Sequence, residues 1–337
     1  MYAFARSALF ALEPESAHDV TLRTLSHSAA LARRIYARKV PHVPVDLMGL
    51  QLPNPIGLAA GLDKDGRCID GLSALGFGFV EVGTVTPEPQ PGNAKPRLFR
   101  LPEQRALINR LGFNNEGVAT LVERAKRRRS ATALGINIGK NLTTSVEHAL
   151  DDYLACLNAV HGSADYIAVN ISSPNTPGLR TLQFGEQLDA LLGPIRAKSR
   201  ELDAQAGRNV PLLVKIAPDM SEEEVALVAG SIARNELDGV IATNTTVSRD
   251  AVSDDPQAQE AGGLSGKPVF EASNTVIRLL RAHLPTLPII GVGGIDSGEA
   301  AKAKMAAGAD LVQLYSGLIY QGPALVQQCA KALKQGE

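Results

Sequence analysis

Short, nearly continuous runs of apolar residues recur along the chain, and longer stretches of helical patterning separate them. Eight such runs stand out, at residues 56–61, 79–85, 134–139, 166–172, 212–217, 239–243, 289–293 and 311–315. Parallel strands buried on both faces are apolar throughout rather than alternating. Eight of them with helical crossovers predict an α/β fold, a (β/α)₈ TIM barrel of about 250 residues. An open, doubly wound sheet is the structural alternative.

Polar and glycine residues come at the ends of these predicted strands. They include Asp63, Lys64, Thr84, Asn137, Asn170, Ser173, Lys215, Asn244, Gly293, Gly294, Tyr315 and Ser316. Active sites of (β/α)₈ barrels lie at the carboxyl ends of the strands, so this placement predicts a functional site. The general polarity of loops would explain one or two such ends, but it explains polar groups at all eight poorly.

Residues 1–44 form a unit of different character, and residues 45–337 form the predicted barrel domain. The first unit has six Arg or Lys against three acidic residues, whereas the remainder has 28 against 32. Pro14 with Ser16 and Asp19 can start a second helix. The first helix carries apolar residues on neighbouring strips, at Met1, Phe4, Ala5, Ala8, Leu9 and Leu12.

A basic cluster at the end of this unit suits anionic lipid headgroups, and it consists of Arg33, Arg34, Arg38 and Lys39. Two short amphipathic helices with such a cluster are typical of a segment that lies in a membrane interface. A helical cap packed on the barrel has the same pattern. Composition alone leaves both interpretations open.

The overall composition excludes several classes of protein. The 337 residues are 45% hydrophobic and 20% charged with a net charge of −1, so no electrostatic footprint for nucleic acid is expected. Cys68, Cys156 and Cys329 predict neither a disulfide framework nor a zinc site, and no other metal site is expected. The chain has no apolar run of the roughly 20 residues that a spanning helix needs, and no secretory signal. A cytoplasmic protein is therefore expected.

Two glycine-containing segments, residues 291–295 and 314–317, end the seventh and eighth predicted strands. Backbone N–H groups in such loops bind phosphate without a charged side chain. Glycine at a strand end can also be simple turn chemistry, but two such loops in tandem favour a phosphate site. The first segment comes too late in the chain for a dinucleotide-binding fold and lacks the Gly-x-Gly-x-x-Gly spacing.

Lys64 and Lys215 end buried strands, where lysine is rare unless it meets an anionic ligand. A lysine charge beside N1 of a flavin ring would favour the anionic reduced form, and Lys215 is the candidate for this role. Uncharged amides can match the alternating N–H and C=O groups of a pyrimidine edge without the cost of desolvating a charge. The candidates are Asn109, Asn170, Asn175 and Asn244, with Thr245.

Four segments together resemble class 2 dihydroorotate dehydrogenase: residues 60–64 (AGLDK), 109–115 (NRLGFNN), 170–180 (NISSPNTPGLR) and 262–266 (GGLSG). The resemblance covers essentially the whole chain, including LFALEPESAH in the first unit. It implies an FMN enzyme that oxidises dihydroorotate to orotate in pyrimidine biosynthesis and passes electrons to a membrane quinone. It also implies that residues 1–44 build a quinone tunnel and associate peripherally with the cytoplasmic side of the cell membrane. A monomer is expected by class analogy.

The same resemblance assigns residues to roles. Ser173 becomes the base that removes the C5 proton, where class 1 enzymes have cysteine. The implied FMN contacts are Ala60, Gly61, Lys64, Thr84, Asn137, Asn170, Lys215, Thr243, Gly266, Gly294, Tyr315 and Ser316. The implied substrate contacts are Lys64, Asn109, Arg110, Leu111, Gly112, Phe113, Asn170, Asn175, Asn244 and Thr245.

Two other functions remain open from the residues themselves. One is a flavin barrel that acts on another dihydropyrimidine or on dihydrouridine in RNA, although the overall charge does not support RNA binding. The other is a non-catalytic barrel that merely holds a phosphate. A hydroxyl is also a weak base, so Ser173 needs a proton relay, and we expect Thr176 and Phe113 to shape a water path for it.

Overall fold

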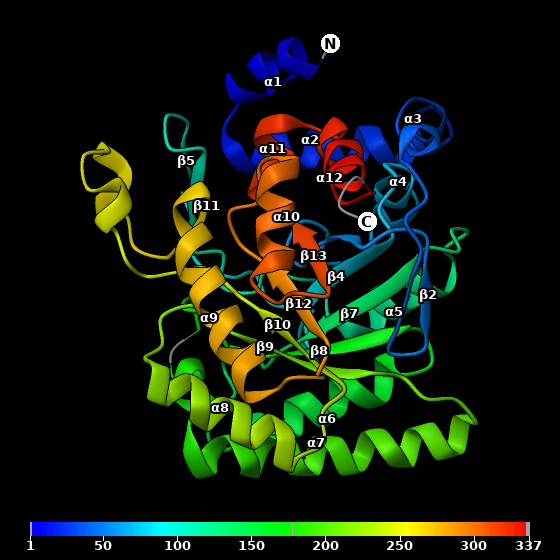
Figure 1. Ribbon diagram of the computed structural model, residues 1–337, viewed down its shortest axis with the longest axis vertical. Helices are drawn as coiled ribbons and strands as arrows, with labels where there is room; N and C mark the ends of the chain where they lie inside the picture. Colours follow the sequence, from blue (N-terminus) through cyan, green and yellow to red (C-terminus); the bar gives the residue numbers. More distant parts are fainter. Residues whose placement is uncertain (1, 177, 335–337) are drawn as a thin grey trace.

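Eight parallel strands close into a barrel in the computed structural model, which describes residues 2–176 and 178–334 (Figure 1). Their order around the barrel is β3 (Ile56–Leu58), β4 (Phe79–Val85), β7 (Ala133–Ile138), β8 (Tyr166–Asn170), β9 (Leu212–Ile216), β10 (Gly239–Ala242), β12 (Ile289–Val292) and β13 (Leu311–Leu314). β13 pairs with β3 to complete the ring. The predicted (β/α)₈ barrel is thus confirmed, and the open sheet is excluded.

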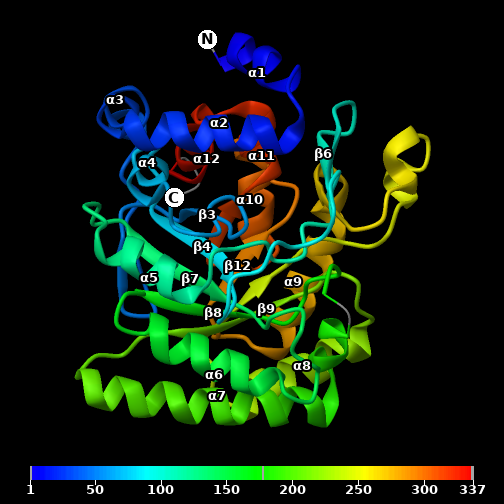
Figure 2. The same ribbon diagram turned by 180° about the vertical axis from the view of Figure 1, so that it is seen from behind.

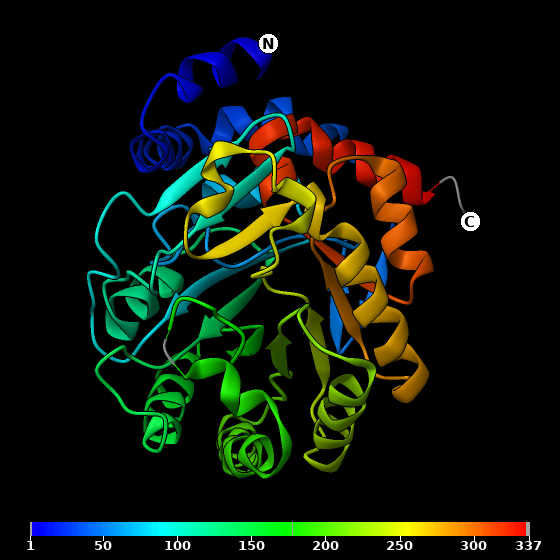
Figure 3. The ribbon, with the colours of Figure 1, turned by 90° about the vertical axis from the view of Figure 1, so that its left-hand side faces the viewer.

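Helices surround the barrel, as the view in Figure 3 shows. They are α4 (Ile69–Ser73), α5 (Val118–Lys126), α6 (Ala149–Val160), α7 (Gly185–Ala206), α8 (Glu222–Arg234), α9 (Phe270–His283), α10 (Gly298–Ala306), α11 (Ser316–Gln321) and α12 (Ala324–Lys334). α8 illustrates how local sequence defines a helix. Ser221 and Glu224 form a capping box at its start, and Val225, Val228 and Ile232 recur at helical spacing on its buried face.

The amino ends of the strands are closed by a hairpin, β1 (Val45–Leu47) and β2 (Leu50–Leu52). Leu52 packs there in one cluster with Phe79, Tyr166 and Leu213 from the barrel strands. At the carboxyl ends a small antiparallel sheet is formed by β5 (Leu98–Leu101), β6 (Ala106–Asn109) and β11 (Gly263–Gly266). The hairpin therefore covers the amino end of the barrel. Short 3₁₀ turns fill the remaining loops at Leu179–Gln183, Asp250–Val252, Pro256–Gln259 and Lys267–Val269.

Three helices and a 3₁₀ turn precede β1, rather than the two helices expected: α1 (Tyr2–Phe10), α2 (Pro14–His27), α3 (Ala29–Ile35) and the turn Ala37–Lys39. The extra helix arises because α2 ends at His27, and Ser28, whose N–H bonds back to Thr24, caps it just before α3 starts at Ala29. Pro14 is the first residue of α2, as predicted. Met1 lies outside the described residues.

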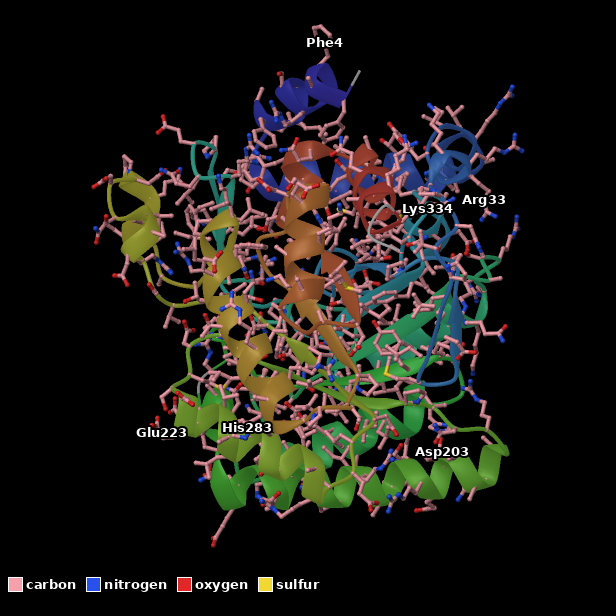
Figure 4. The ribbon with its side chains drawn as sticks, viewed as in Figure 1. Phe4, Arg33, Asp203, Glu223, His283 and Lys334 are labelled. Atoms are coloured by element: carbon pink, nitrogen blue, oxygen red, sulfur yellow. The ribbon has the colours of Figure 1, made fainter. Side chains whose placement is uncertain are left out.

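α1 differs from the other two N-terminal helices because none of its residues is buried. It lies at the outer edge of the molecule in Figures 1 and 2, where Tyr2 Oη donates to the Ile319 carbonyl of α11 at 2.6 Å, and Phe4, which is 84% exposed, projects away from the molecule in Figure 4. α2 and α3, by contrast, place Leu22 and Ala32 in the main hydrophobic core. The segment is therefore a packed cap in its second half and a projecting amphipathic helix in its first. No helix in the described ranges is long and apolar enough to cross a membrane.

Candidate functional site

A cavity of about 1000 Å³, open to solvent on one side, lies at the carboxyl ends of the barrel strands. It gathers nearly all the residues that the sequence singled out. From the predicted cofactor contacts it is lined by Ala60, Gly61, Lys64, Thr84, Asn170, Lys215, Thr243, Gly266, Gly294, Tyr315 and Ser316. From the predicted substrate contacts it adds Asn109, Leu111, Gly112, Phe113, Asn175, Asn244 and Thr245, and Ser173 also lines it.

Two predicted contact residues do not line the cavity. Asn137 is completely buried beneath it, where its Oδ1 accepts a hydrogen bond from Thr84 Oγ1 at 2.6 Å. Arg110 is turned outward. Its guanidinium pairs with Glu260 at 2.5 Å and stacks 4.6 Å from the centre of the Phe99 ring. In the structure both residues support lining residues instead of facing a ligand.

The asparagines form two hydrogen-bonded groups, one around Asn170 and one that pairs Asn175 with Asn109. Asn170 Nδ2 donates to Thr84 Oγ1 at 2.9 Å and to Asn137 Oδ1 at 3.2 Å. Asn244 Nδ2 donates to Ser172 Oγ at 3.0 Å. Across the cavity, Asn175 Nδ2 donates to Asn109 Oδ1 at 3.2 Å. These bonds fix the orientation of these amides before any ligand arrives.

Both strand-end lysines line the cavity, where Lys215 is buried and Lys64 is half-buried. Burial lowers the pKa of Lys64 to about 8, with Asp65 opposing the shift, and Lys64 Nζ donates to the Gly61 carbonyl at 3.0 Å. Burial also lowers the pKa of Lys215, and the carboxylate of Glu81 opposes that shift. Within the described chain, Lys215 Nζ has neither a hydrogen-bond acceptor nor an ion-pair partner. Its ammonium is therefore available to a ligand in the cavity.

Glu81 lies fully buried inside the barrel below the cavity. Its carboxylate accepts hydrogen bonds from Asn137 Nδ2 at 2.9 Å, Tyr166 Oη at 2.8 Å and Gln313 Nε2 at 2.7 Å. Burial, and then the Glu81 carboxylate, raise the pKa of Tyr166. These three neutral donors thus compensate the Glu81 carboxylate for its loss of hydration. The same carboxylate acts electrostatically on Lys215.

The glycine loop after β12 presents free backbone donors. The N–H groups of Gly293 and Gly294, and those of Ser316 and Gly317 after β13, donate to no protein atom in the described ranges. Gly294 has φ +76°, and a Cβ there would lie 2.5 Å from Phe270 Cβ. Only glycine fits this position without strain. The two loops therefore form an anion-binding concavity of backbone donors.

Ser173 is buried with 5% of its surface exposed. Its Oγ accepts a hydrogen bond from the Asn175 N–H at 3.2 Å, and it has no contact with a histidine or carboxylate in the described chain. Phe113 lines the same cavity, whereas Thr176 is buried outside its lining. Proton removal by Ser173 would therefore depend on solvent that reaches it through the cavity.

A second, smaller cavity of about 590 Å³ lies between α2 and the barrel. α2 contributes Glu15, His18, Asp19 and Leu22. Burial lowers the pKa of His18 to about 4, so its imidazole is neutral at pH 7, while Glu15 and Asp19 bring carboxyl groups to the same side of the cavity. Gly61, Lys64, Leu111 and Tyr315 line both cavities and form the wall between them.

Several lining residues were missed by the sequence analysis. Gln313 sits within an apolar strand, where a lone inward-facing amide was the available signal. Ser265 comes from β11, and its Oγ lies 2.8 Å from Ser316 Oγ. Local sequence patterns do not predict such a contact between distant segments. The remaining ones provide mainly apolar walls: Ala59, Pro174 and Val269. Val292, Gly293, Ile295 and Gly317 also line the cavity, and they belong to the two glycine-containing segments that the sequence singled out.

Comparison with known proteins agrees with this geometry. A family model described as dihydroorotate dehydrogenase matches residues 42–336. "Dihydroorotate dehydrogenase (quinone)" of Delftia acidovorans (strain DSM 14801 / SPH-1) is 57% identical, with 99% of this chain and 98% of the relative covered. The Burkholderia mallei (strain SAVP1) enzyme of the same name is also 57% identical, with 100% and 98% covered.

Two solved structures from the same family of enzymes are similar to this chain over nearly its whole length. The crystal structure of DHODH from Eimeria tenella in complex with ferulenol has a TM-score of 0.87 at 35% identity, covering 95% of this chain and 90% of that one. The ligand-free form has a TM-score of 0.86 at 37% identity, covering 95% and 94%. The residues that line the cavity, the barrel and the full-length similarity agree, and the chain belongs to the dihydroorotate dehydrogenase family.

Proposed function

We propose that this enzyme oxidises dihydroorotate to orotate in the larger cavity, with FMN as its resident cofactor and a membrane quinone as the electron acceptor. One observation carries the proposal. A single cavity combines backbone anion donors at one end, the Lys215 ammonium, a preorganised ring of amides and the Ser173 hydroxyl. The full-length similarity to enzymes named for dihydroorotate and quinone supports it.

The residues present fit FMN. The N–H groups of Gly294, Ser316 and Gly317 would hold the phosphate, and Lys215 would lie at the ring as a compensating charge. Bound FMN would supply hydride acceptance and then electron transfer to a quinone. Thr84 and Asn170 are held by hydrogen bonds to Asn137, so the polar groups facing the ring need little reorganisation.

The amide network suits the pyrimidine ring of the substrate. Asn109, Asn175 and Asn244 offer both donors and acceptors at fixed positions, and these complement the alternating N–H and C=O edge. Lys64 would bind the substrate carboxylate while its amine is protonated. The carboxylate of the substrate would then pair with the Lys64 ammonium, and the uncharged edge of its ring would bond to the uncharged asparagine amides.

Ser173 is the proposed base for the C5 proton. Its Oγ is fixed by the Asn175 N–H, which leaves the hydroxyl proton free to leave toward solvent in the cavity. The proposed relay runs through water shaped by Phe113 and by the loop that carries Thr176. The C5 proton would pass to Ser173 as the Ser173 proton passes to water, so the serine ends each turnover unchanged.

The smaller cavity is the proposed quinone site. It lies against the wall formed by Gly61, Lys64, Leu111 and Tyr315, directly beside the larger cavity. α1 with its exposed Phe4, the exposed Leu12 just after it, and the basic residues of α3 would bring the entrance to an anionic membrane surface. Arg33 extends from α3 into solvent in Figure 4. We assign residues 1–44 this role and place the enzyme peripherally on the cytoplasmic face, as a monomer.

Anaerobic mixing with dihydroorotate tests the proposal directly. The flavin absorbance of the purified enzyme should bleach with dihydroorotate and recover when a soluble ubiquinone analogue is added. The matched control is dihydrouracil, which lacks the carboxylate that Lys64 would bind and should bleach the flavin far more slowly. A yellow protein that dihydroorotate does not bleach would remove this substrate, and bleaching without recovery would remove the quinone.

A further inference from the structure

Lys304 of α10 is a buried lysine outside the cavity. Its side chain is completely inaccessible to solvent, and its stem packs over β12 so closely that a Cβ on Gly291 would lie 2.7 Å from Lys304 Cγ. Nζ lies 4.7 Å from the centre of the Phe270 ring. In the described ranges no carboxylate lies within ion-pair distance of it. Burying an unpaired lysine is unfavourable, so its presence needs a physical reason.

A chain of hydrogen bonds connects this lysine to the glycine loop after β12. Lys304 Nζ donates to Ser273 Oγ at 2.9 Å, and Ser273 Oγ donates to the Val292 carbonyl at 2.5 Å. The Thr243 N–H also donates to that carbonyl, at 2.9 Å. The Val292 carbonyl is thus held by two donors.

The fixed carbonyl determines where the next N–H points. The carbonyl and N–H of a planar trans peptide point in opposite directions, so the Gly293 N–H is directed away from Ser273 and Thr243. That N–H has no acceptor in the described chain, and Gly293 lines the larger cavity directly before Gly294, whose N–H is one of the proposed phosphate donors. Ser273 also supports the loop directly, because its Cβ would be 3.1 Å from a Cβ at Gly293.

We infer that Lys304 and Ser273 are positioning residues that orient the glycine loop for a phosphate monoester, and that the buried Lys304 ammonium adds attraction for that dianion. The inference rests on the proposed function, because it concerns the phosphate of FMN. Lys304 Nζ is connected to the glycine loop through Ser273, and both side chains are buried in protein, away from water. Charge interactions over such a path are screened less than at the surface.

The charges around Lys304 favour a lysine that gains a proton when an anion binds. Burial lowers its pKa to about 7, Glu271 raises it and Arg278 lowers it. These two residues of α9 are exposed and pair with each other at 3.7 Å. Asp296, on the loop before α10, pairs with Arg105. A bound phosphate would raise the pKa of Lys304, so FMN affinity should fall as pH rises above 7.

Displacement of FMN from the holoenzyme by riboflavin, which lacks the phosphate, tests the inference. Lys304→Met should reduce the preference for FMN over riboflavin roughly tenfold at pH 7 and flatten its dependence on pH between 7 and 9. Lys302→Met, on the same helix but only half-buried, is the matched control and should leave the preference unchanged. A purely structural role would weaken both flavins equally and would overturn the inference, as would an unchanged preference in Lys304→Met.

A second variant covers the case in which Lys304→Met does not fold. Ser273→Ala keeps the lysine but breaks the connection to Val292, and FMN should be released severalfold faster, as followed by flavin fluorescence after dilution. Unchanged release in Ser273→Ala would exclude the positioning role. A wild-type protein that holds no FMN would overturn the proposed function and this inference with it, whereas tight FMN binding unaffected by both variants would overturn the inference alone.

Discussion

Glu15 and Arg97 form a buried ion pair between α2 and the start of the small sheet, with Arg97 Nη2 2.9 Å from Glu15 Oε1. The guanidinium also donates to the carbonyls of Pro91 and Asn93. Glu15 lines the smaller cavity, so this pair fixes the wall of the proposed quinone site as well as the position of α2.

Loss of this pair should affect stability and quinone reduction together. Glu15→Gln should lower the free energy of unfolding by roughly 1–3 kcal/mol, because Arg97 then lacks its charged partner. Reduction of the flavin by dihydroorotate should continue, while reoxidation by a quinone analogue should slow. Urea unfolding and stopped-flow absorbance measure the two effects. Glu123→Gln, in an exposed pair with Arg127, should change the unfolding free energy by less than about 1 kcal/mol.

Ser173→Ala should slow flavin reduction by dihydroorotate at least about a hundredfold, because no other hydroxyl replaces the base. Reoxidation by quinone should keep its wild-type rate. In the wild type the reduction rate should rise with pH, since the serine proton must leave to solvent. Anaerobic stopped-flow traces across a pH series measure both properties. A Ser173→Ala enzyme with normal flavin reduction would disprove the assignment.

Substrate affinity should depend on the charge of Lys64, whose pKa burial lowers to about 8. The ammonium is present below that pH and is lost above it, so KM for dihydroorotate should rise as pH increases from 7 to 9. Lys64→Met should show a raised KM with little remaining dependence on pH. Lys126→Met, an exposed lysine on α5, serves as the control for general charge effects. A flat KM profile in the wild type would contradict the proposed contact.

Membrane association should depend on α1 and the turn that follows it rather than on the whole N-terminal segment. Replacing Phe4 and Leu12 by serine should reduce cosedimentation with anionic vesicles severalfold, because both side chains are exposed and apolar. Leu227→Ser, an exposed leucine on α8, is the matched control. Removing all of residues 1–40 would be less informative, since Leu22 and Ala32 belong to the barrel core. Equal vesicle binding by both variants would argue against the α1 anchor.

The sequence predicted the barrel well because each buried parallel strand is a compact apolar run ending in a polar residue. β4, for example, is buried at every position and ends beside Thr84 and Thr86. The sequence was less informative about whether a residue at a strand end faces the cavity or turns away from it. Asn137 turns toward Glu81 and Arg110 toward Glu260, choices set by partners that lie far away in sequence. The buried Lys304 gave no signal, because an isolated lysine on a helix is usually solvated.

The wall shared by the two cavities separates the routes by which the two reactants would enter the enzyme. Under the proposed assignment, four residues separate a chamber open to water from one that faces lipid. A charged, water-soluble substrate and an apolar quinone can then bind in turn, each entering through its own cavity. A compound lodged beside α2 would leave the aqueous mouth free, so raising the dihydroorotate concentration would not displace it.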